Sequence, residues 1–162
     1  MGLNYFLERK VMIDKILSTY DWFDHPDGPK FAETHRDQHR SSGHWLFLPN
    51  TFSSFHRVNN NEEIWAIHLG RVLIHVLEPD GRHRVIPLGT DFDTGERPVV
   101  TIPGGYWQAA ELPEGARFAF GTNICAPPFL LSEFSIAERA DLLQQFPQHM
   151  EVIKRLTRET LD

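Results

Sequence analysis

The chain has 162 residues, of which 41% are hydrophobic and 12% aromatic, so it carries enough apolar material for one packed domain and is not globally disordered. Sixteen Lys and Arg residues against 22 Asp and Glu residues give a formal net charge of −6 without any basic stripe, which argues against a nucleic-acid-binding protein. Cys125 is the single cysteine, which excludes an intrachain disulfide and a cysteine-based zinc site, and its free thiol predicts a cytoplasmic location.

The N-terminal part of the chain predicts a helix over about residues 4–20. Ile13, Ile16 and Leu17 recur there at helical spacing, which indicates one apolar helix face. The HPDGPK segment that follows has the Pro, Gly and Asp residues that favour a turn. From about residue 31 to 125, short runs rich in Val, Ile, Phe and Trp alternate with polar breaks. That pattern predicts short strands in an all-β barrel or sandwich.

The C-terminal part becomes helical again after two consecutive prolines, over about residues 136–158. Ser135 and Glu138 have the spacing of a capping box, so we expect a helix to start there and to end near Pro147. A second helix is expected through residues 150–156. No repeat, long linker or run of about 18 apolar residues is present in the sequence. The whole 162-residue chain is therefore expected to form a single soluble domain, with no membrane span.

Polar residues occur in register on two of the expected strands. Ser54 and His56 are two residues apart, so we expect both side chains on one face of their strand. In the next strand Glu63 and Trp65 share a face. A buried, ionised Glu63 needs a partner, and His56 is the obvious one. The alternative is that Glu62 and Glu63 are both surface charges after a polar turn.

The other histidines give weaker signals. His68 lies opposite Glu63 in strand parity, so we expect it on the surface or at an interface. His44 and His75 have no polar company in register and are expected to be half-buried strand residues. The histidines between residues 25 and 83 show no ligand spacing such as HxH or HExxH. Their number is therefore not evidence for a metal site.

The PGG segment at residues 103–105 predicts a tight turn. It would present Tyr106, Trp107 and Gln108 at the start of the next strand. Aromatic walls with a few convergent polar groups are typical of a small-molecule pocket. Trp65 and Trp107 are equally consistent with a role as ordinary core aromatics.

These segments resemble the two motifs of a cupin barrel. The residues at the defining motif positions are Ser54, His56, Glu63 and Gly70 in the first motif and Pro103, Gly105 and Gln108 in the second. Longer matches, over about residues 12–149, resemble the small uncharacterised cupins of cupin family five. The segments that carry this resemblance are HPDGPKFAETHR, FSSFHRV, EEIW, GERPVVTIPGGYWQAA and APPFLLSEFSIAERADLLQQFP.

The resemblance implies an all-β jelly-roll barrel with short helices at both ends of the chain, paired into a homodimer. It also implies that Ser54 and Gln108 stand where other cupins have metal ligands. No cofactor is required by this pattern. If a divalent metal binds, it binds loosely, with His56, Glu63 and Gln108 as its ligands, because late first-row metals prefer imidazole and only one is present.

Three functions remain open on the residues alone. The first is a module that binds a small ligand with His56, Glu63 and Gln108, lined by Ser54, Trp65 and Trp107. The second is metal-free epimerase or isomerase chemistry by analogy with nucleotide-sugar epimerases of the superfamily. There His56 would be the base and Tyr106 the acid, and Arg36 and Arg57 would receive an anionic substrate. The third is weakly metal-dependent chemistry.

Overall fold

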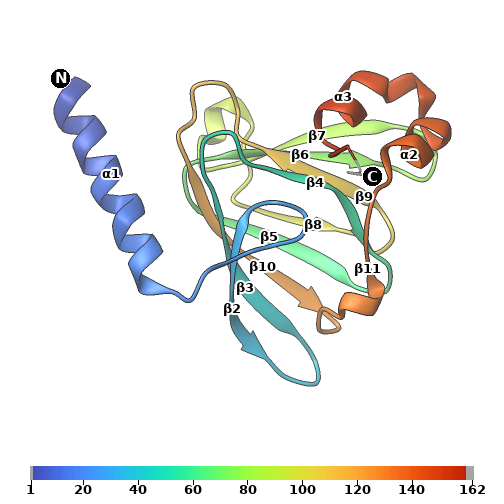
Figure 1. Cartoon of the computed structure of the whole chain (residues 1–162), viewed down its shortest axis with the longest axis horizontal. Coiled ribbons are helices and arrows are strands. Elements are labelled where there is room, and N and C mark those ends of the chain that lie inside the picture. Colours follow the sequence, from blue (N-terminus) through green and yellow to red (C-terminus); the bar gives the residue numbers. More distant parts are fainter. Residues whose placement is uncertain (1, 160–162) are drawn as a thin grey trace.

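The computed structural model describes residues 2–159, and the side chains of residues 10–159, as two antiparallel β-sheets that enclose an apolar core (Figure 1). The first sheet has the strand order β1-β2-β3-β10-β5-β8, formed by Phe23–Asp24, Lys30–Arg36, Ser41–Phe47, Ala119–Ala126, Glu62–Leu69 and Val99–Ile102. The second has the order β11-β4-β9-β6-β7, formed by Phe134–Ile136, Phe52–Val58, Trp107–Glu111, Val72–Leu77 and His83–Leu88. The predicted all-β barrel is thus confirmed.

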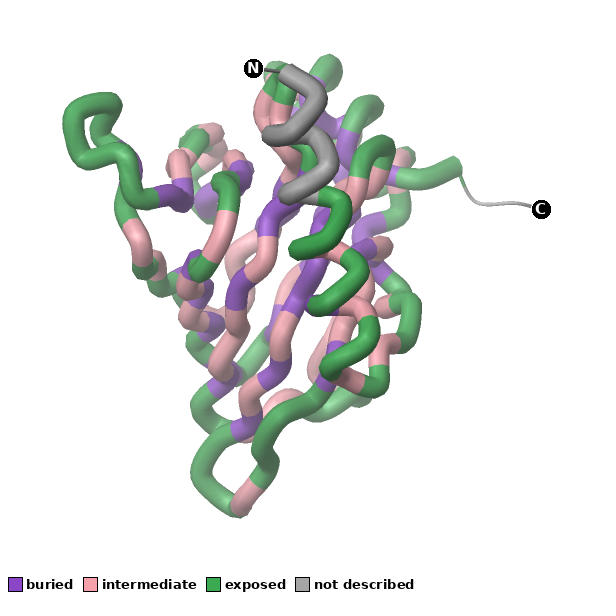
Figure 2. The backbone as a smooth tube through the Cα atoms, turned by 90° about the vertical axis from the view of Figure 1, so that its left-hand side faces the viewer, coloured by how far each residue is buried: buried purple, intermediate pink, exposed green. Residues whose placement is uncertain are grey.

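The predicted N-terminal helix is present as α1, Gly2–Thr19, shown in blue at one side of Figure 1. Ile16 is its buried contact, and it packs with Leu46 of β3 and Phe118 on the outer face of the first sheet. The described side chains of α1 are otherwise mostly exposed, as the tube in Figure 2 shows. None of the helices within residues 2–159 has the length and apolar content that a membrane span requires.

Pairing across the first sheet gives the barrel one apolar end and one polar end. On the inner face, Trp45 of β3 lies opposite Gly121 of β10, and Glu63 of β5 lies opposite Cys125. A Cβ atom on Gly121 would stand 2.2 Å from the Trp45 ring, so only glycine leaves room for the indole there. On the side of Trp45 that is away from Glu63, the core is aliphatic and aromatic. The polar residues collect at the end of the barrel that holds Glu63.

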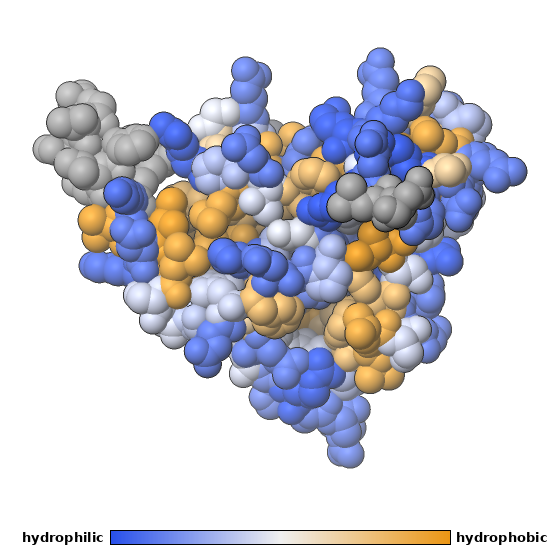
Figure 3. Space-filling model, viewed as in Figure 1, coloured by the Kyte–Doolittle hydropathy of each residue, from blue (hydrophilic) through white to orange (hydrophobic). Residues whose placement is uncertain are grey.

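The C-terminal helices cover the outer face of the second sheet. They are α2, Arg139–Gln145, and α3, Met150–Arg155, joined by a short 3₁₀ turn at Pro147–His149. Leu142, Ile153 and Leu156 are buried there against Phe55 of β4. Figure 3 shows the resulting surface, on which hydrophobic patches are interspersed with hydrophilic residues.

The expected capping box is wrong, although both predicted helices are present. Ser135 belongs to β11 and pairs with Arg57 of β4. Glu138 precedes α2 but makes no side-chain hydrogen bond to cap it. The strand pairing holds Ser135 extended, so the helix begins only at Arg139, beyond the reach of the serine hydroxyl.

If the C-terminal helices are part of the folded core, truncating a buried side chain beneath them should lower the free energy of unfolding. We expect Leu142→Ala to lower the free energy of unfolding by about 2–5 kcal/mol, because it opens a cavity under α2. Leu131→Ala is the matched control, since Leu131 is 69% exposed and Leu142 only 1%. Its cost should stay within about 0.5 kcal/mol. Urea unfolding of both variants checks this, and equal costs would contradict the packing described.

Candidate functional site

A cavity of about 340 Å³ occupies the polar end of the barrel. Its walls combine aromatic rings with charged and polar side chains from both sheets. The aromatic members are Phe23, Phe31, Trp45, Trp65, Phe129 and Phe134. The polar members are His25, Asp27, Glu33, Arg36, Ser41, Ser42, His56, Glu63, Asn123 and Cys125.

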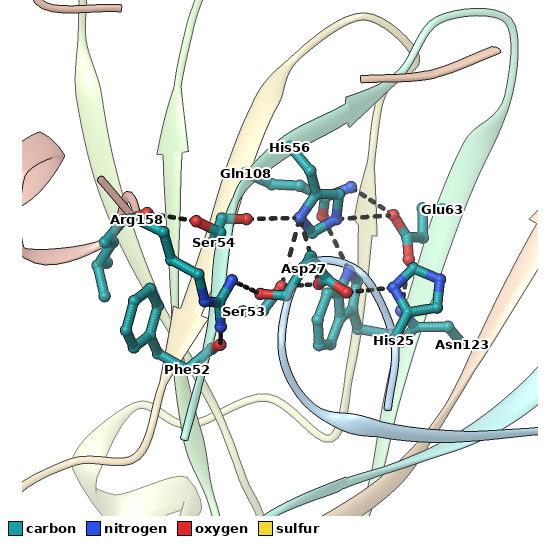
Figure 4. Close-up of polar contacts among 12 residues, drawn as sticks. His25, Asp27, Phe52, Ser53, Ser54, His56, Glu63, Gln108, Asn123 and Arg158 are labelled. Atoms are coloured by element: carbon teal, nitrogen blue, oxygen red, sulfur yellow. Dashed lines mark hydrogen bonds and ion pairs between the residues drawn. The ribbon is translucent and has the colours of Figure 1, made fainter. Parts of the chain in front are cut away.

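Glu63 and His56 face each other across the cavity from opposite sheets (Figure 4). The Nε2 atom of His56 lies 3.8 Å from Glu63 Oε2, an ion-pair distance that is longer than a hydrogen bond. The two Glu63 oxygens accept hydrogen bonds from the side-chain amides of Gln108 and Asn123. Gln108 is oriented in turn by Trp65, whose Nε1–H donates to the Gln108 Oε1 at 2.9 Å. The expected inward direction of Glu63 is therefore observed, and Glu62 is exposed.

Asp27 is a third charged member that strand parity did not predict. It lies in the turn that was expected from the HPDGPK segment, and it is 4% exposed. Its carboxylate accepts from the Ser53 hydroxyl, contacts His25 Nδ1, and lies 3.5 Å from His56 Nδ1. Asp27 was not predicted as a site residue, because the HPDGPK segment was interpreted only as a turn. The available signal was an Asp beside a His in a turn that precedes a strand.

The C-terminal residues hold this turn in place. The Arg158 guanidinium donates to the backbone carbonyl of Asp27 and, at 3.2 Å, to that of Phe52. Gly28 allows the close approach, since its φ is 134° and a Cβ there would stand 2.1 Å from Arg158 Nη2. The position of the Asp27 carboxylate thus depends on a residue 131 positions further along the chain.

The two carboxylates keep His56 charged. Burial by itself would lower the pKa of the imidazole, but Glu63, Asp27 and the Ser54 carbonyl outweigh it and raise the pKa of His56 to about 9. The Nδ1–H donates to the Ser54 carbonyl at 2.8 Å. Burial likewise would raise the pKa of Asp27, but His25, His56 and Ser53 lower it below its ordinary value. At neutral pH the site therefore holds an imidazolium between two carboxylates.

Ser54 does not share a face with His56, so the parity prediction is wrong at this position. The pairing of β4 with β9 shifts register between Ser53 and His56, which inserts one extra residue into β4. The bulge brings Ser53 to the His56 side, with its Oγ 3.3 Å from His56 Nδ1. Ser54 instead directs its hydroxyl to the Leu156 carbonyl, at 3.4 Å.

The predicted aromatic and basic residues are divided between the cavity, the outer face of the second sheet and the turn before β9. Trp65 lines the cavity. Trp107 lies on the outer face, where Arg57 stacks on its ring at 4.5 Å and Gln145 accepts from its Nε1–H at 3.3 Å. Tyr106 is not among the lining residues and packs against the apolar core at the turn before β9. Alternation along β9 explains this split, because Gln108 takes the inner face.

Arg36 does line the cavity, but its guanidinium is already engaged. The Nε and Nη2 atoms donate to Glu33 Oε2 at 3.0 and 2.6 Å, and Nη1 donates to the Phe129 carbonyl at 2.8 Å. With Arg57 on the outer face, the expected pair of arginines that would receive an anionic substrate is not formed.

Histidines other than His25 and His56 do not line the cavity, and His68 is exposed, as predicted. The prediction that His44 and His75 lack polar company is wrong. His44 and His68 both contact the Thr122 hydroxyl, at 2.8 and 2.7 Å. His75 contacts His83 at 3.0 Å and Glu111 at 2.9 Å on the outer face of the second sheet. These partners all lie on other strands, which the pattern of a single strand does not reveal.

The cavity donors do not fit a resident metal ion. His56 is the one imidazole that faces Glu63, and both Glu63 oxygens and both polar atoms of Gln108 are already hydrogen-bonded. Ser54, at the first of the motif positions, directs its hydroxyl away from the cavity to the Leu156 carbonyl. Among the residues whose side chains are described, no group of three or more His, Cys, Asp or Glu side chains has metal-ligand geometry. A divalent ion would have to break these amide contacts.

The charged imidazole predicts a specific dependence of stability on pH. The pKa of His56 rises from its ordinary 6.5 to about 9 on folding, so its stabilisation is complete below about pH 6.5 and is lost as pH rises through 9. The full effect is about 3 kcal/mol. We expect the difference in unfolding free energy between the native protein and His56→Gln to shrink by this order between about pH 6 and pH 10. Urea unfolding at both values measures it, and pH-independent differences would contradict the charged state.

Asp27 should be one of the groups that set the His56 pKa. We expect Asp27→Asn to lower that pKa below about 9, because one of the two facing carboxylate charges is removed. Asp24→Asn is the control, since that side chain is 81% exposed and pairs with Lys30 instead. An NMR titration of the His56 ring protons reads the pKa in each variant. Equal shifts in both variants would contradict the assigned pairing.

Comparison with known proteins identifies the fold family. The family model described as Cupin superfamily (DUF985) matches residues 14–137. A protein of Shewanella oneidensis is similar with a TM-score of 0.84 and 24% identity, covering 90% of this chain and 97% of that one. A hypothetical protein of Leishmania major is similar with a TM-score of 0.81 and 25% identity, covering 93% and 98%. No curated protein matches the chain.

More distant similarity extends to named proteins that share the fold. Streptomyces PAC13, described with uridine, has a TM-score of 0.55 and 10% identity, covering 75% of this chain and 87% of that one. Oxalate decarboxylase of Bacillus subtilis has a TM-score of 0.59 and 13% identity, covering 90% of this chain and 41% of that one. With the family model matched over residues 14–137 and a barrel of two antiparallel sheets, the chain belongs to the cupin superfamily, in the family DUF985 (cupin family five).

Proposed function

We propose that this cupin binds a small organic molecule in the barrel cavity, with the His56 imidazolium as the group that donates a hydrogen bond to it. The observation that carries the proposal is the buried charge at the end of an aromatic-walled cavity. Burying an imidazolium and two carboxylates costs free energy that a structural role would not need to spend. The cavity volume of about 340 Å³ is within the range of small-molecule sites.

The direction of the His56 hydrogen bonds supports this role. The His56 Nδ1–H donates a hydrogen bond to the Ser54 carbonyl, and this bond fixes the orientation of the ring. Nε2–H has Glu63 Oε2 at 3.8 Å, which leaves the donor without a close acceptor on that side. A ligand oxygen can therefore accept from Nε2 while Glu63 balances the charge.

Acid catalysis is a second candidate function, and the His56 pKa favours it over the base role expected from the sequence. Below about pH 9 the ring is protonated, so it cannot remove a proton but can give one to a substrate oxygen. Tyr106 is not a lining residue, which removes the acid partner that the epimerase analogy requires. The isomerase hypothesis therefore lacks both the base and the acid that it requires. Ligand binding requires no catalytic group, so it remains the first proposal.

The isomerase alternative has a distinct signature. If His56 abstracts a proton, deuterium from solvent should enter a candidate sugar nucleotide at a rate that rises with pH toward about 9, as the neutral imidazole becomes populated. We expect no incorporation at neutral pH. Incorporation that increases with pH and disappears in His56→Gln would replace binding by isomerisation as the function.

A thermal-shift screen against a metabolite library tests the binding proposal. A ligand that occupies the cavity should raise the melting temperature by about 2–4 °C for each kcal/mol that it contributes. We expect His56→Gln to lose the shift and His68→Gln to keep it, since His68 is exposed on the outer face of the first sheet. A library with no stabilising compound, or a shift that survives in His56→Gln, would count against the proposal. The homodimer expected from the family stays a prediction.

A further inference from the structure

We infer that the cavity selects an uncharged, flat molecule that bears an amide, and that it rejects carboxylates and organic cations. This inference rests on the proposed function and specifies its ligand class. It is carried by the charges of the lining residues, by two buried polar atoms without partners, and by the shape of the walls.

The lining charges disfavour an anion. Three carboxylates line the cavity, those of Asp27, Glu33 and Glu63, against the cations of Arg36 and His56. Every nitrogen of Arg36 donates to Glu33 or to the Phe129 carbonyl. His25, the other imidazole that lines the cavity, contacts the Asp27 carboxylate, and His56 is flanked by Asp27 at 3.5 Å and Glu63 at 3.8 Å. A bound carboxylate would approach these two like charges in a water-poor site.

The two orphaned atoms specify what the ligand must supply. Trp45 Nε1 and Asn123 Oδ1 are buried without a hydrogen-bond partner among the described residues, and both residues line the cavity. Trp45 pairs with Gly121 and Asn123 with Gly43, so the two side chains lie on the same inner face of neighbouring strands. One atom is a donor and the other an acceptor. A ligand that satisfies both must present an acceptor and a donor, which is what a primary or cyclic amide offers.

The walls select a flat molecule. The Trp45 and Trp65 rings are tilted by 49° with centroids 5.5 Å apart, and the Phe129 and Phe134 rings meet edge to face with centroids also 5.5 Å apart. Flat rings can stack on such faces with little loss of contact. An organic cation would also contact the rings, but its positive charge would approach that of the His56 imidazolium.

A matched set of nicotinamide derivatives separates these demands. Isothermal titration calorimetry would compare nicotinamide with nicotinate, which adds a negative charge, and with 1-methylnicotinamide, which adds a positive one. N,N-dimethylnicotinamide keeps the acceptor but removes the donor that Asn123 Oδ1 requires. Uracil and its carboxylate orotate repeat the charge comparison on a second ring. We expect nicotinamide and uracil to bind, and each altered compound to bind at least about tenfold more weakly.

The variant Trp45→Phe tests the orphaned donor directly. It keeps an aromatic ring but removes the indole N–H, so nicotinamide should bind roughly fivefold more weakly. Trp22→Phe is the matched control, because Trp22 donates to the Ile16 carbonyl on the outer face of the first sheet. Its affinity for nicotinamide should equal that of the native protein. Circular dichroism confirms that each variant is folded.

These experiments distinguish a wrong ligand class from a wrong binding function. Binding of nicotinate, orotate or 1-methylnicotinamide as tightly as the neutral amides would overturn the ligand class and leave a binding function standing. Absence of binding by both neutral amides would also overturn the ligand class. The metabolite screen alone then tests the proposed binding function. A charged ligand that stabilises the native protein but not His56→Gln would support that function. A screen in which no compound stabilises the protein would contradict it.

Discussion

The contact on which the site depends is the buried imidazolium of His56 between the carboxylates of Asp27 and Glu63. Three charges in a low-dielectric interior are stable only as a set, because any one of them alone would carry an uncompensated desolvation penalty. Each charge comes from a different part of the chain, a turn and two strands of opposite sheets. The barrel must therefore close before these groups can pair, and the amides of Gln108 and Asn123 can orient only around a carboxylate that is already in place.

The same arrangement also occupies the polar groups at the motif positions. A metal site needs several donor atoms that converge on one point and are free to bind the ion. Here the side-chain polar atoms of Gln108, from the second motif, are hydrogen-bonded to Trp65 and to Glu63 of the first motif. Gln108 links Trp65 to Glu63, so an amide occupies the place where an imidazole would coordinate. The motif positions are retained, but their chemistry is that of a hydrogen-bonded network around an ion pair.

Most of the fold and part of the site follow from the sequence, and the reasons for the limits are physical. Alternation predicts correctly that Glu63 and Trp65 point inward, because β5 keeps a regular register with β10 from Glu62 to Ile67, and His68 is exposed as predicted. It fails at Ser54, because a bulge in β4 shifts the parity by one residue, and local sequence does not encode where a partner strand will shift register. Asp27 was missed because it lies in a turn, where no periodicity exists and position is set by contacts with distant segments.

One of these distant contacts has a consequence for biosynthesis. The Leu156 carbonyl accepts from the Phe55 backbone N–H, and Arg158 holds the carbonyl of Asp27, so residues near 156–158 complete a site whose lining residues all precede residue 135. On a translating ribosome the strands can begin to pair while these residues are still in the exit tunnel. During that interval the turn that carries Asp27 lacks its anchor. The nascent barrel acquires its full site only as the segment after α3 emerges and docks.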